Sequence, residues 1–102
     1  MKKISKIILA FVVGMFLTSG VNIKAATLEE IKEKGLLVAG MNAEYPPFEW
    51  VEVVDGEAVV VGIDASLAQM IADEIGVELV IDNRAFDSLI PTLNTNKIDL
   101  II

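Results

Sequence analysis

The stretch that decides the fold is LLVAGMNAEYPPFEW, residues Leu36 to Trp50. Its first six residues form a continuous apolar run, which indicates a buried strand of the kind found in parallel sheets. From Asn42 onward the residues are polar, aromatic and stiffened by two prolines, so the strand ends by presenting side chains and does not turn back. Ligands of open α/β sheets bind at the carboxyl ends of strands. A carboxamide, a carboxylate and an aromatic ring at this point therefore indicate a small-molecule site.

Helix and strand patterns alternate around this strand. Asp55-Gly56, between two β-rich runs, is a strong hairpin pattern, and Thr27 opens a capping-box pattern for a short helix that Gly35 stops. The expected elements are helices over 27–34, 64–75 and 88–95 and strands over 36–41, 50–54, 57–61, 77–81 and 98–102. This order predicts an α/β fold, with a parallel βαβαβ core, right-handed crossovers and an inserted β-hairpin.

Three carboxylates in this pattern have ordinary structural explanations. Asp64 and Asp87 each stand at the start of a predicted helix, where a short carboxylate caps the first free backbone N–H groups. We therefore expect both to be helix caps and not ligands. Glu44 is expected to be a solvated loop carboxylate.

The first 25 residues have the three regions of a secretory signal peptide. Three lysines lie within residues 1–6, residues 7–17 are apolar and uncharged, and small residues follow at Ala25-Ala26. The apolar segment is shorter than the roughly 20 residues that a membrane-spanning helix needs. We expect residues 1–25 to be cleaved from a periplasmic or secreted protein, and a short N-terminal membrane anchor is the alternative.

The composition excludes several classes of function. After residue 25, 15 acidic residues face four basic ones, which leaves a net charge of −11 and a surface that repels nucleic acid and anionic membranes. The chain has no cysteine and no histidine. Disulfides, thiolate metal sites, cysteine catalysis, a lipid anchor on cysteine and histidine-based triads are therefore excluded. We expect no metal and no cofactor.

Several segments resemble signatures of the solute-binding proteins of polar amino acid ABC transporters (bacterial extracellular solute-binding proteins, family 3). They are LLVAGMNAEYPPFE at 36–49, VGIDASLA at 61–68, FDSLIPTL at 86–93 and KIDLII at 97–102. Their order and spacing match those of the family. The resemblance implies a type II periplasmic-binding fold, in which two α/β lobes joined by a hinge close on an amino acid. Residues 26–102 would supply the N-terminal part of lobe 1.

The resemblance also implies three ligand-binding residues. Asn42 sits where members often place an acidic residue that meets the ligand's ammonium group or side chain. Tyr45 matches an aromatic residue that packs on the ligand's aliphatic stem, and Phe86 matches a second ring on the opposite wall of the cleft. Asn42 departs from the acidic version, although its carboxamide oxygen can still accept a hydrogen bond. Without the resemblance, Tyr45 and Phe86 would be interpreted as core aromatics.

The leading hypothesis for function is a non-catalytic protein that captures an amino acid and delivers it to the membrane permease of an ABC transporter. We expect it to have no nucleic-acid partner and to be a monomer at full length. One alternative is a ligand-sensing module of a larger receptor or of a cell-wall enzyme. An enzyme on the same scaffold is another alternative. It would need a perturbed carboxylate pair, for which Glu44 and Asp87 qualify by residue type only.

The end of the sequence affects what the chain alone is expected to do. It stops within an apolar strand, and a native domain rarely ends on an uncovered hydrophobic edge. We therefore expect a truncated chain, the opening of a larger protein, or an incomplete product without activity. In the family, an arginine that holds the ligand carboxylate would follow residue 102, and Arg84 does not match it. Without those donors and the second lobe, these 102 residues are expected to bind amino acids very weakly or not at all.

Overall fold

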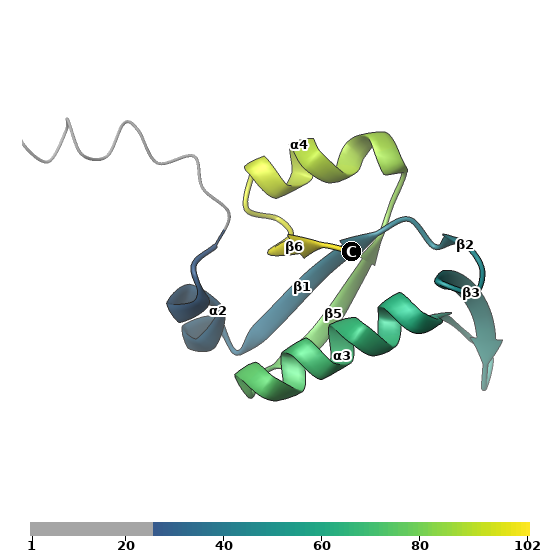
Figure 1. The fold of residues 1–102 in the computed structure, drawn as a ribbon, viewed down its shortest axis with the longest axis horizontal. Coiled ribbons are helices and arrows are strands. Elements are labelled where there is room, and N and C mark those ends of the chain that lie inside the picture. The colour runs from purple at the N-terminus through teal and green to yellow at the C-terminus, as the bar shows by residue number, and fades with distance from the viewer. Residues whose placement is uncertain (1–25) are drawn as a thin grey trace, which may run out of the picture.

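The computed structural model describes residues 26–102, so the predicted signal peptide lies outside the described residues. The elements in chain order are α2 (Leu28–Lys34), β1 (Leu36–Met41), β2 (Glu44–Tyr45), β3 (Glu49–Val54), β4 (Glu57–Val61), α3 (Ile63–Ile75), β5 (Glu78–Asn83), the 3-10 helix η1 (Phe86–Ser88), α4 (Leu89–Asn94) and β6 (Leu100–Ile101). The predicted order of strand, hairpin, helix, strand, helix and strand is confirmed (Figure 1). Within residues 26–102 no helix is long and apolar enough to cross a membrane.

A parallel sheet forms the centre of the fold. Its strand order is β5-β1-β6, so the apolar strand β1 lies in the middle. Both of its neighbours run parallel to it, with Leu36 opposite Glu78 and Ala39 opposite Leu100. The three strands therefore end at the same edge of the sheet, and the polar residues that follow β1 and β5 lie close together.

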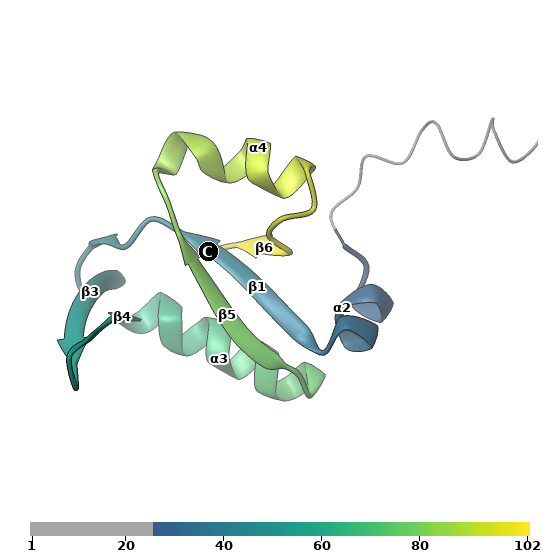
Figure 2. The same ribbon diagram turned by 180° about the vertical axis from the view of Figure 1, so that it is seen from behind.

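Helices cover both faces of this sheet, with α3 and α4 on opposite sides (Figures 1 and 2). Side chains alternate along a strand, and the buried Leu37, Ala39 and Met41 pack on the side of α2 and α3. Gly40 faces the other way. A Cβ there would collide with the side chain of Ile98 and lie 3.3 Å from Leu89 Cδ2. The glycine therefore lets α4 pack directly on β1.

The predicted hairpin is present in a second, antiparallel sheet of order β2-β3-β4. Trp50 pairs with Val61 and Val54 pairs with Glu57. Both turn residues have positive φ, 52° at Asp55 and 83° at Gly56. Asp-Gly suits such a two-residue turn because both residues adopt positive φ with less steric strain than most others.

The prediction for the first helix is confirmed. The Thr27 hydroxyl accepts a hydrogen bond from the Glu30 backbone N–H at 3.2 Å. Gly35 ends the helix with φ 74°. This short helix leads straight into β1.

The predictions that Asp64 and Asp87 cap helices are wrong. The N-cap of α3 is Gly62, and Asp64 lies inside the first turn. Gly62 has φ 123°, and a Cβ there would collide with the carbonyl oxygen of Phe48. The close approach of the two backbones therefore fixes where α3 begins. Asp87 lies inside η1, whose N-cap is Ala85.

A partly buried ion pair connects α2 to the residue that precedes β6. The Lys34 ammonium donates to both carboxylate oxygens of Asp99, at 3.1 and 3.0 Å. The Val38 backbone N–H also donates to Asp99, at 2.8 Å. The Asp99 side chain is 0% exposed. This carboxylate thus joins α2, β1 and the start of β6.

Candidate functional site

A cavity of about 200 Å³ lies at the carboxyl ends of β1 and β6. Its lining residues are Asn42, Tyr45, Glu49, Phe86, Leu89, Ile101 and Ile102. The structure therefore brings the three predicted ligand-binding residues together around one space. Larger and more open hollows run along α3 and the hairpin. They lack this combination of an amide, a carboxyl group and two aromatic rings, which is the kind of lining that orients a small polar ligand.

The two aromatic residues of the cavity are exposed. Tyr45 is 69% exposed and Phe86 is 75% exposed, so neither is a core aromatic. Tyr45 comes from β2, where its ring lies 6.3 Å from that of Phe48. Phe86 comes from η1, a separate element that precedes α4. Exposed rings on two elements are free to pack on a ligand's aliphatic or cationic portion.

Asn42 is held in one orientation by its neighbours at the sheet edge. Its side-chain N–H donates to the Arg84 carbonyl oxygen at 3.1 Å. The Arg84 backbone N–H in turn donates to the Met41 carbonyl oxygen at 3.0 Å. With its amide nitrogen occupied, Asn42 retains its carbonyl oxygen as an acceptor. Asn42 is therefore suited to receive a ligand's N–H group.

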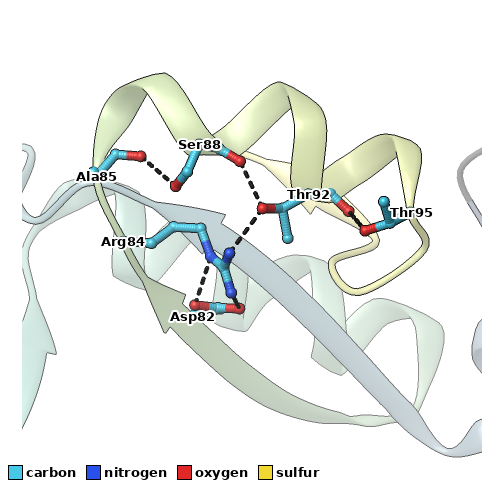
Figure 3. Close-up of polar contacts among 6 residues, drawn as sticks. All are labelled: Asp82, Arg84, Ala85, Ser88, Thr92 and Thr95. Atoms are coloured by element: carbon cyan, nitrogen blue, oxygen red, sulfur yellow. Dashed lines mark hydrogen bonds and ion pairs between the residues drawn. The ribbon is translucent and has the colours of Figure 1, made fainter.

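The side chain of Arg84 joins β5 to α4 (Figure 3). Its guanidinium donates to the two carboxylate oxygens of Asp82 at 3.1 and 2.8 Å and to the Thr92 hydroxyl at 2.8 Å. The Thr92 hydroxyl donates to the Ser88 carbonyl oxygen at 2.6 Å. The hydrogen bonds to Asp82 raise the pKa of Arg84 above its ordinary value. This cation is thus engaged in structure and not positioned to receive a ligand carboxylate.

Glu49 is a cavity residue that the sequence reasoning missed. Its Oε2 is the one buried side-chain polar atom among residues 26–102 for which no hydrogen-bond partner is identified. A hydrogen bond with the Asp64 carboxyl group, then burial, then the charge of Asp64 raise the pKa of Glu49 to about 7. The pairing of Tyr45 with Glu49 across β2 and β3 places both side chains on one face. That cross-strand pairing exists only in the folded chain, so the sequence pattern did not single out Glu49.

The acids considered for an enzyme do not meet in this cavity. Glu44 and Asp87 are exposed, and neither is among the lining residues. The influence of Asp64, which raises the pKa of Glu49, was not anticipated.

These features define a class of protein. A parallel α/β lobe with an inserted hairpin presents an amide, aromatic rings and a carboxyl group around a small cavity at its strand ends. This is the arrangement of a lobe that binds a small polar solute. The family model for bacterial extracellular solute-binding proteins, family 3, matches residues 37–102, and the chain belongs to this family.

Named relatives agree with this assignment. The chain is 30% identical over 95 residues to the L-cystine-binding protein TcyJ of Escherichia coli, covering 89% of this chain and 35% of that protein. An amino acid ABC transporter substrate-binding protein from Streptococcus pneumoniae, solved bound to L-arginine, is 47% identical with a TM-score of 0.70, over 74% of this chain and 31% of that one. The predicted fold class is confirmed by these structural neighbours.

A third relative was solved as a single domain. The arginine-bound form of domain 1 from TmArgBP is 49% identical with a TM-score of 0.64, and the match covers 72% of this chain and 56% of that domain. One domain of that protein was therefore solved with arginine bound. The chain spans about a third of the length of curated relatives that it matches.

Proposed function

We propose that residues 26–102 form part of lobe 1 of an extracellular amino acid-binding protein that serves an ABC transporter. The observation that carries this proposal is the cavity at the strand ends, where Asn42, Tyr45 and Phe86 meet. In this assignment the Asn42 carbonyl oxygen accepts a ligand N–H group. The two rings pack on the ligand's stem. The protein makes and breaks no bond in the ligand, and it hands the ligand to a membrane permease.

The preferred ligand is an amino acid with a cationic side chain, such as L-arginine. The Glu49 oxygen lacks a partner within residues 26–102, and a guanidinium or ammonium group supplies the N–H donors it lacks. The exposed rings of Tyr45 and Phe86 favour a cation as well. Two of the solved relatives, from Streptococcus pneumoniae and TmArgBP, were bound to arginine.

The location follows from the same assignment. Residues 1–25 act as a cleaved signal peptide, which delivers residues 26–102 to the periplasm or the medium. The excess of acidic residues keeps the mature surface soluble and away from anionic lipid.

Binding by the 102-residue chain alone is expected to be weak. Within the described residues, Arg84 is paired with Asp82, and Lys34 is paired with Asp99. Neither cation lines the cavity, so the ligand carboxylate lacks a charge-assisted donor there. Isothermal titration with L-arginine should show no saturation at micromolar concentrations. Micromolar affinity would contradict this expectation.

The site itself is tested by NMR, which detects weak binding. Added L-arginine should shift the resonances of Asn42, Tyr45 and Phe86. Phe86→Ala should weaken binding by roughly 2- to 30-fold, the equivalent of the ~0.5–2 kcal/mol of a cation–π contact. Ile90→Ala is the matched control, because Ile90 is an exposed apolar residue of α4 outside the cavity. Equal effects of the two variants, or no shifts at Asn42, would refute the proposed site.

A further inference from the structure

Two asparagine side chains replace a backbone hydrogen bond where the central sheet ends. β1 and β5 lie side by side and parallel (Figure 1), and the Arg84 N–H donates to the Met41 carbonyl oxygen at 3.0 Å. If the ladder continued in this register, the Ala43 N–H would donate to the Arg84 carbonyl oxygen. It donates instead to the Asn83 side-chain oxygen at 2.9 Å. The Arg84 carbonyl oxygen accepts the Asn42 side-chain N–H in its place, at 3.1 Å.

We propose that Asn83 is a positioning residue of the amino acid site, which acts on the ligand through Asn42. By accepting the Ala43 N–H, the Asn83 side chain leaves the Arg84 carbonyl oxygen to the Asn42 amide. The Asn42 carbonyl oxygen is thereby held in place to accept a ligand N–H group. The proposal rests on the proposed function, because that assignment makes Asn42 the ligand's acceptor. Asn83 itself is not among the residues that line the cavity.

Burial of Ala43 explains why one side chain controls the other. Ala43 is 6% exposed, and a buried backbone N–H without a partner is costly. Without the Asn83 oxygen, the acceptor that the strand register offers to this N–H is the Arg84 carbonyl oxygen. The Ala43 N–H would then compete with the Asn42 side chain for that oxygen.

Release of the Asn42 side chain would weaken ligand binding. A backbone N–H is held by the strand, whereas a side-chain amide can rotate away, so we expect Asn42 to lose the competition. A side chain that is free before binding must lose its rotamer freedom when the ligand orders it. The pair of asparagine contacts thus preorganises the acceptor before the ligand arrives.

The first test is NMR of the isotope-labelled, ligand-free full chain. Asn83→Ala should move the Asn42 side-chain N–H resonances toward those of a free amide. It should also produce a coupling, through the new hydrogen bond, between the Ala43 nitrogen and the Arg84 carbonyl carbon. Failure of either change to appear would overturn the role of Asn83. Asn94→Ala, which removes an exposed asparagine of α4 outside the cavity, is the matched control and should produce neither change.

A conservative variant separates orientation from a general loss of structure. Asn83→Asp retains a side-chain oxygen to accept the Ala43 N–H, so the Asn42 side-chain resonances should stay as in the unaltered chain. The same displacement in Asn83→Asp as in Asn83→Ala would overturn the proposal. This variant is used without ligand, because its added charge would itself attract a cation.

Addition of L-arginine tests whether the orientation matters for binding. Followed by the resonances of Phe86, Asn83→Ala should weaken binding by roughly 2- to 10-fold, as for one lost hydrogen bond. Asn94→Ala should leave the affinity unchanged. Equal affinity of Asn83→Ala and the unaltered chain would overturn the positioning role while the site stands. If L-arginine leaves Asn42 and Phe86 of the unaltered chain unmoved, the proposed function fails, and the ligand-free spectra still decide whether Asn83 orients Asn42.

Discussion

Removing either partner of the partly buried Lys34–Asp99 pair should destabilise the chain, and by different amounts. Lys34→Met leaves the buried Asp99 carboxylate with the Val38 N–H as its remaining hydrogen-bond donor. Breaking a fully buried pair costs about 3–5 kcal/mol. The Lys34 side chain is 41% exposed, so water screens part of the interaction and we expect about 2–3 kcal/mol. Asp99→Asn retains an acceptor for Val38, and its expected cost is about 1–2 kcal/mol.

The double variant Lys34→Met/Asp99→Asn distinguishes a true pair from two independent sites. Its cost should fall below the sum of the single variants by about 1–2 kcal/mol, because neither change then strands a buried charge. Urea unfolding followed by the fluorescence of Trp50, the one tryptophan of the chain, measures all three free energies of unfolding. Lys32→Met, an exposed lysine on the same helix, should change stability by less than about 0.5 kcal/mol. Additivity within about 0.5 kcal/mol would refute the coupling.

Three other perturbations test the contacts that shape the site. Gly62→Ala should lower the free energy of unfolding by about 2–4 kcal/mol, because φ is 123° and the new Cβ would collide with the Phe48 carbonyl oxygen. Gly76 has φ 85° but open space around it, so Gly76→Ala should lower the free energy of unfolding by less in the same urea assay. Arg84→Lys keeps the charge but loses the planar guanidinium that joins β5 to α4 through Asp82 and Thr92. The free energy of unfolding should therefore fall by about 1–2 kcal/mol, and the backbone amides of α4 should exchange faster with D₂O. Unchanged exchange would contradict this role of Arg84. Because the pKa of Glu49 rises from 4.5 to about 7 on folding, the folded chain binds more protons between these values, and the free energy of unfolding should decrease as pH rises through them. Glu49→Gln should flatten that dependence, and a slope of the opposite sign would disprove it.

Much of the fold could be predicted because local and long-range preferences agree. The apolar run of β1 is the central strand, and Asp55-Gly56 forms the turn it predicts. Local rules were insufficient at the start of α3. Asp64 has the right residue type for a cap, but the close approach of Gly62 to the Phe48 backbone sets the first turn. That approach joins the hairpin to the helix and is a tertiary contact, which no rule about neighbouring residues contains.

The candidate site shows the same division. Asn42, Tyr45 and Phe86 could be selected because they follow strand ends or match a known pattern, and the structure places all three around one cavity. Glu49 could not be selected by position along the chain. Its significance depends on the pairing of β2 with β3 and on the proximity of Asp64, both of which exist only after folding. Residue identity thus predicted the polar strand end, whereas the charge of the cavity required the three-dimensional arrangement.

The position of the negative charge in the cavity explains why a neutral residue is acceptable at Asn42. The side-chain N–H of Asn42 donates to the Arg84 carbonyl oxygen, and an aspartate there would have no proton to donate and would repel that oxygen. The amide therefore fits this sheet edge better than the acid that the family often carries. The carboxyl group of Glu49, on the facing hairpin, supplies an acidic function to the same cavity. Because a hydrogen bond with Asp64, burial and the charge of Asp64 raise the pKa of Glu49 to about 7, its charge changes with pH near neutrality, which the charge of an isolated aspartate at position 42 would not do.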